Sequence, residues 1–85
     1  MKYSVKTKGT CSVAVEFDLD NGIVRNVSFI GGCNGNTIGI SRLCEGVPAQ
    51  EIIGRLKGIR CGFKSTSCPD QLAQAIEDAL EKERG

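Results

Sequence analysis

Apolar and polar residues alternate along residues 13–19 with the period of two that is typical of a half-buried strand. After Asp20-Asn21-Gly22 the alternation resumes and continues to Phe29, so the two segments predict a β-hairpin. Tyr3 and Val5 alternate in the same way and predict a short strand before it. The apolar positions of the hairpin are Val13, Val15, Phe17, Leu19, Ile23, Val27 and Phe29.

Two registers are open to this hairpin. A two-residue turn at Asn21-Gly22 pairs Asp20 with Ile23, whereas a three-residue loop pairs Leu19 with Ile23. The three-residue loop collects the large apolar side chains on one face, and a slip of one residue would scatter them. We therefore predict the three-residue loop. Its pairs are Leu19 with Ile23, Phe17 with Arg25, Val15 with Val27 and Val13 with Phe29.

This register brings two cysteines to the same end of the hairpin. The next pair of the ladder is Cys11 with Gly31, which places Cys11 on the buried face, and Cys33 follows just past the last pair. Thiols that are 22 positions apart in the chain are therefore expected to lie close together.

Helical periodicity follows the hairpin. The first helix would begin between Asn34 and Thr37 and end before Gly46, the second would run from about Ala49 to Lys57, and the third would begin around Cys68. Strands followed by helices predict one α+β domain over residues 1–85, an antiparallel meander of two or three strands with three helices packed on one face. The residues expected to face the core are Ile40, Leu43, Cys44 and Val47 in the first helix, Ile52, Ile53 and Leu56 in the second, and Leu72, Ala75, Ile76, Ala79 and Leu80 in the third.

The composition of the chain excludes several kinds of functional site. The formal net charge is +1, which predicts binding to neither nucleic acid nor a membrane surface. Histidine is absent, and this removes imidazole bases and mixed Cys/His zinc sites. The first eight residues hold no apolar stretch typical of a signal peptide, so we expect a reducing, cytoplasmic location. Cysteines there are metal ligands, redox thiols or packing residues more often than structural disulfides.

The five cysteines carry the candidate chemistry. Cys33 and Cys68 each precede or open a predicted helix, and a helix N-terminus stabilises the thiolate form that binds metals. Cys44 lies on the core stripe of a helix and is predicted to be a packing residue. Cys11 and Cys61 are open to either role. No two cysteines have the C-x-x-C spacing of zinc ribbons or thioredoxin-like sites.

Two segments resemble the signatures of a known family. Thr66-Ser67-Cys68-Pro69-Asp70 matches the motif that names the TSCPD domain family, and Gly31-Gly32-Cys33-Asn34-Gly35-Asn36 is similar to its other signature. A similar domain occurs at the C-terminus of some adenosylcobalamin-dependent ribonucleotide reductases, so the resemblance implies a link to deoxyribonucleotide synthesis. An 85-residue chain cannot hold the barrel of such a reductase, and we expect no independent reductase activity.

The order of elements also resembles the IscU/NifU-type scaffolds on which iron–sulfur clusters are assembled. This resemblance implies that Cys11, Cys33 and Cys68 are the ligand cysteines. Val13 and Ser67 occupy the positions at which those scaffolds have an aspartate and a histidine. With Cys61 as a fourth ligand, the site would be closed and structural rather than open.

Three functions compete. The one we favour is a metal-binding module in which Cys11, Cys33 and Cys68, with Cys61 as a further ligand, hold Zn²⁺ or an Fe–S cluster. The second is a thiol accessory of ribonucleotide reductase, in which two cysteines cycle between dithiol and disulfide. The third is an interaction domain whose cysteines only pack. The expected partners are a ribonucleotide reductase or a metal-trafficking protein.

Overall fold

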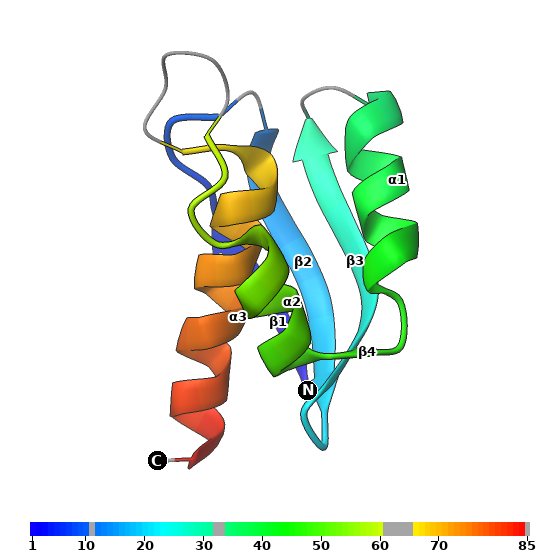
Figure 1. The fold of residues 1–85 in the computed structure, drawn as a ribbon, viewed down its shortest axis with the longest axis vertical. Helices are drawn as coiled ribbons and strands as arrows, with labels where there is room; N and C mark the ends of the chain where they lie inside the picture. The colour runs from blue at the N-terminus through cyan, green and yellow to red at the C-terminus, as the bar shows by residue number, and fades with distance from the viewer. Residues whose placement is uncertain (11, 32–33, 61–65, 85) are drawn as a thin grey trace.

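The computed structural model describes residues 1–10, 12–31, 34–60 and 66–84, with side chains undescribed at 34–36 and 84. A four-stranded antiparallel sheet has the strand order β1-β2-β3-β4, and three helices accompany it (Figure 1). The predicted α+β class is confirmed, with one strand more than expected. The elements are β1 (Lys2–Lys6), β2 (Ser12–Asp20), β3 (Ile23–Gly31), α1 (Asn34–Cys44), β4 (Val47–Pro48), α2 (Ala49–Leu56) and α3 (Cys68–Arg84).

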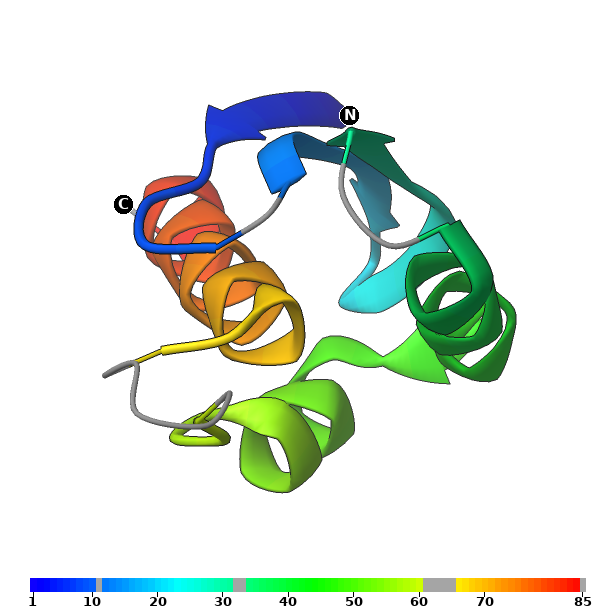
Figure 2. The same cartoon turned by 90° about the horizontal axis from the view of Figure 1, so that it is seen from above.

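All three helices lie on the same side of the sheet (Figure 2). The faces predicted for α2 and α3 meet the sheet: Ile52, Leu72 and Ile76 are buried, and Leu56 and Leu80 pack half-buried against them. No helix of the described residues is long and apolar enough to cross a bilayer. The buried cluster consists of Val15, Phe17, Leu19, Val24, Val27, Cys44, Ala49, Ile52, Leu72, Ala75, Ile76 and Ala79.

The turn of the β2–β3 hairpin has two residues, so the predicted three-residue loop is wrong. Asn21 and Gly22 both have positive φ angles, 52° and 79°, as a type I′ turn requires. Asp20 therefore pairs with Ile23, and Leu19 pairs with Val24. The type I′ turn prevails because its twist matches that of the two strands it joins.

A β-bulge in β3 then returns the apolar side chains to the core. The ladder shifts between Glu16 and Asp18, opposite Asn26, whose φ angle is 55°. Beyond the bulge Val15 pairs with Phe29, so none of the four predicted pairs forms. Val24 and Val27 are both buried although they are three residues apart, which an unbroken strand does not allow.

A second register shift, between Ser12 and Ala14, changes the start of β2. Ser12 pairs with Gly31 and is buried, whereas Val13 is 64% exposed. The prediction that Val13 faces the core is therefore wrong, because the shift reverses the alternation. Gly31 has Ser12 rather than Cys11 as its partner, and Cys11 itself lies outside the described residues.

The segment after α1 also differs from the prediction. α1 ends at Cys44, and Val47 begins the short strand β4, which pairs with Ile23 and Val24 of β3. Cys44 is buried as predicted and Ile40 is half-buried, but Leu43 is 80% exposed. The buried face of α1 carries Thr37 and Cys44, seven residues apart, and Leu43 lies on another face of the same helix.

Candidate thiol site at the start of α3

The starts of β2 and α3 and the end of β3 lie at the same end of the molecule, at the top of Figure 1. Ser12, the first residue of β2, pairs with Gly31, the last residue of β3. Cys68 is the first residue of α3 and is partly buried. Its Sγ lies 3.2 Å from the Oγ of Ser12, within hydrogen-bond distance for sulfur. The structure thus joins three distant segments around one thiol.

Two threonines hold the serine that contacts this thiol. The hydroxyl of Thr7 donates to the carbonyl oxygen of Ser12 at 2.7 Å. The hydroxyl of Thr10 lies 3.1 Å from the Ser12 hydroxyl. Ser12 is only 5% exposed, so this cluster of hydroxyls is set into the fold beside Cys68.

The start of α3 is fixed by a capping serine. Ser67 precedes the helix, and its Oγ accepts a hydrogen bond from the backbone N–H of Asp70 at 3.2 Å. This is the arrangement of an N-cap residue, which satisfies an N–H group that has no partner inside the helix. The Ser67 hydroxyl in turn donates to the carbonyl oxygen of Ile59 at 2.6 Å. The cap therefore also ties the segment after α2 to the start of α3.

Asp70 is the centre of a second, buried set of hydrogen bonds. Its carboxylate accepts from the backbone N–H of Gly58 at 2.7 Å, from the Gln74 amide at 2.8 Å and from the Thr66 hydroxyl. Burial raises the pKa of Asp70, but the hydrogen bonds from Thr66, Gly58 and Gln74 outweigh it, so the pKa lies below its ordinary value. The carboxylate stays ionised and holds three segments together.

These contacts divide the segment Thr66–Asp70 into two parts. Thr66, Ser67 and Asp70 bond to one another or to neighbouring backbone, and Pro69 suits the first turn of a helix, where an N–H is not needed. The Cys68 side chain instead reaches the start of β2. Four residues of the segment thus build the helix start, and the fifth presents a thiol there.

The family model of the TSCPD domain matches residues 1–80. The chain belongs to the TSCPD domain family. Comparisons with curated proteins and with solved structures gave no match. The family's naming motif is the helix-capping segment described above, and its cysteine is the thiol beside Ser12.

Of the residues predicted for the site of this TSCPD domain, the structure describes Cys68, and it places this thiol at a helix start as predicted. Cys11, Cys33 and Cys61 lie outside the described residues. Cys44 is 4% exposed inside the core, and burial raises the pKa of its thiol, so its interpretation as a packing residue is confirmed. Within the described part of the chain, no three Cys, Asp or Glu side chains are grouped as metal ligands.

Sequence reasoning missed Ser12. In the predicted register this residue points away from the core, and a hydroxyl in a strand has no pattern that marks it. Only the register shift near Ala14 turns it toward Cys68.

Proposed function

We propose that this TSCPD domain is a thiolate metal-binding module in which Cys68, Cys11, Cys33 and Cys61 hold Zn²⁺ or an Fe–S cluster. The observation that carries the proposal is the position of the described residues next to these cysteines in the sequence. Ser12 follows Cys11 and contacts Cys68, and Gly31, two residues before Cys33, pairs with Ser12. Ile59 is two residues before Cys61 and accepts a hydrogen bond from Ser67, next to Cys68.

Cysteine thiolates are suitable ligands for both Zn²⁺ and an Fe–S cluster. Thiolates are soft ligands that suit Zn²⁺ and Fe–S clusters, and four of them complete a closed site. Cys68 is the first residue of α3 and its side chain is only partly buried, which leaves the thiol within reach of a metal ion. The Ser12 hydroxyl lies within hydrogen-bond distance of the same sulfur.

The test compares two cysteines that the structure places in different settings. We would express the wild type, Cys68→Ala and Cys44→Ala with added zinc and iron, purify them anaerobically, and measure bound metal by elemental analysis. An absorption scan distinguishes an Fe–S cluster from Zn²⁺, because Fe–S clusters absorb visible light and Zn²⁺ does not. We expect metal in the wild type and in Cys44→Ala, and its loss in Cys68→Ala.

A folded, metal-free wild type would overturn the proposal, and so would full metal content in Cys68→Ala. If the metal-free wild type formed and broke a disulfide reversibly, the redox-accessory function would take its place. Far-UV circular dichroism of each variant shows whether metal loss reflects a missing ligand or a missing fold.

A further inference from the structure

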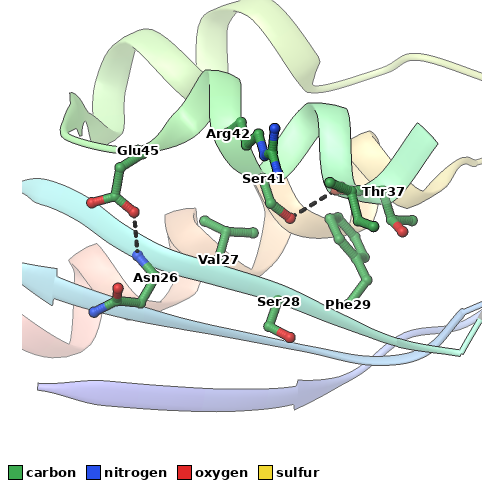
Figure 3. Close-up of a pocket in the computed structure, with 9 residues that line it drawn as sticks. Asn26, Val27, Ser28, Phe29, Thr37, Ser41, Arg42 and Glu45 are labelled. Carbon is green, nitrogen blue, oxygen red and sulfur yellow. Dashed lines mark hydrogen bonds between the residues drawn. The ribbon is translucent and has the colours of Figure 1, made fainter. Parts of the chain in front are cut away.

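An open groove of about 650 Å³ runs between β3 and α1 (Figure 3). One wall is formed by residues 26–29 of β3, and the other by α1 and the turn after it, between residues 37 and 45. The two elements lie side by side (Figure 1). Each wall is about 10 Å long, at about 3.3 Å per strand residue and about 1.5 Å per helical residue. The two walls therefore run beside each other over about 10 Å.

On the strand side of this groove, the part of β3 beyond β4 has no partner strand among the described residues on its outer side. β4 pairs with Ile23 and Val24 only, the Asn26 N–H is bonded to Glu45, and no described strand pairs with residues 27–31 on that side of β3. Helix α1 flanks this edge but leaves the groove open. A free strand edge binds an extended peptide by continuing the hydrogen-bond ladder of the sheet.

The charged side chains of the groove favour an acidic occupant. The Glu45 carboxylate accepts a hydrogen bond from the Asn26 N–H at 2.9 Å and lies 3.9 Å from Nη1 of Arg25, so its charge is compensated (Figure 3). Arg42, on the same wall, forms no ion pair with any described residue. The uncompensated charge of the groove is therefore positive.

The groove is also lined by groups that suit a peptide more than a small anion. Val27 and Phe29 provide apolar surface between the polar residues Ser28 and Ser41. The Ser41 hydroxyl donates to the Thr37 carbonyl oxygen at 2.7 Å. Its proton is therefore not available to bind a small anion together with Arg42. The length, the strand edge and the single cation together describe a site for an extended chain.

We propose that this groove binds an extended acidic segment of a partner protein, which adds to β3 as a strand and pairs a carboxylate with Arg42. The segment would contact both walls over about four residues, since about 10 Å corresponds to three to four strand steps. Arg42 selects the acidic side chain, and the strand edge supplies hydrogen bonds that do not depend on sequence. This site is separate from the thiols and does not depend on a bound metal.

The test is a selection from a phage library of random decapeptides on three immobilised proteins: the wild type, Arg42→Glu and Arg55→Glu. Arg55 is the control for the charge reversal, because it is an exposed arginine in the last turn of α2, outside the groove, where it pairs with Glu51. We expect the wild type and Arg55→Glu to enrich peptides rich in Asp and Glu. Arg42→Glu should bind the best of these at least tenfold more weakly and enrich basic peptides instead.

Amide chemical shifts of the ¹⁵N-labelled protein then locate the bound peptide, and we expect changes at residues 26–30 and 37–42. Failure to enrich any peptide, enrichment that Arg42→Glu does not alter, or shifts elsewhere would each overturn the proposal. Inorganic phosphate that produced the same shifts at the same affinity would identify a small-anion site instead. Dimerisation that protects residues 26–31 would identify a second copy as the occupant.

Discussion

The start of α3 and the flank of α1 are attached to the sheet in different ways. At the start of α3, buried hydrogen bonds of Ser67 and Asp70 fix the backbone, and Leu72 and Ile76 anchor the helix in the core. Along α1, which packs against β3, Leu43 is 80% exposed and an open groove lies between the helix and residues 26–29 of the strand. The first region fixes the position of one thiol through hydrogen bonds, whereas the second leaves side chains and a groove exposed.

The two described cysteines show the same contrast. Cys44 ends α1 with its thiol in the core, where burial raises its pKa and keeps it protonated and inert. Cys68 opens α3, remains partly exposed, and lies beside the Ser12 hydroxyl. The thiol at the end of α1 is thus a packing group, whereas the thiol at the start of α3 is partly exposed in a polar setting.

The largest expected effect comes from removing the carboxylate that fixes α3. Asp70→Ala leaves the Gly58 N–H, the Thr66 hydroxyl and the Gln74 amide without their acceptor. We expect a loss of about 3 kcal/mol in the free energy of unfolding, because hydrogen bonds to a charged group are strong and the buried Thr66 hydroxyl loses its carboxylate acceptor. Urea denaturation followed by circular dichroism measures it.

Asp78→Ala is the control for this substitution, since Asp78 is an exposed carboxylate on the same helix. It should change the stability by no more than about 0.5 kcal/mol. If the two variants were equally stable, the hydrogen bonds of Asp70 would not be what attaches α3.

The same carboxylate makes stability depend on pH. The pKa of Asp70 is lowered in the folded state, so its contribution is fully present above the unfolded value of about 3.9 and is lost as the pH falls through the lower, folded value. We expect the wild type to be more stable than Asp70→Asn at pH 7. The difference should shrink in urea titrations below about pH 4, where the carboxylate takes up a proton. If the difference in unfolding free energy between the wild type and Asp70→Asn stayed constant with pH, the charge of Asp70 would not be what stabilises the helix start.

The elements of the fold could be predicted because hydrophobic periodicity reports burial directly. The faces of α2 and α3 were correct for this reason, and Cys44 was recognised as a core residue. The Cys-Pro-Asp sequence at residues 68–70 likewise indicated a helix start. Leu43 was wrong because the prediction followed the apolar residues of α1, whereas the buried face of this helix includes the polar Thr37 and excludes Leu43.

The register could not be predicted because two local features act against each other. Asn21-Gly22 favours a two-residue turn, while the alternation of apolar residues favours a three-residue loop. The bulge at Asn26 satisfies both, but it depends on one backbone angle that the alternation does not reveal. Ser12 was missed for a separate reason, because a second register shift, between Ser12 and Ala14, sets its direction.

The smallest expected effect tests the bulge that shapes the groove wall. Asn26 has a φ angle of 55°, its N–H donates to Glu45, and its side-chain amide donates to Asp18 at 2.8 Å. Asn26→Val places a β-branched residue in the left-handed region and should cost about 1–2 kcal/mol in unfolding free energy. Asn26→Gly relieves that strain but loses the exposed bond to Asp18, so its effect should stay within about 0.5 kcal/mol.

Ser28→Val is the control, because Ser28 is an exposed position of the same strand with no positive φ, and its effect should be equally mild. If Asn26→Val were no worse than Ser28→Val, the bulge would not be centred on Asn26, and the wall of the groove would need another explanation.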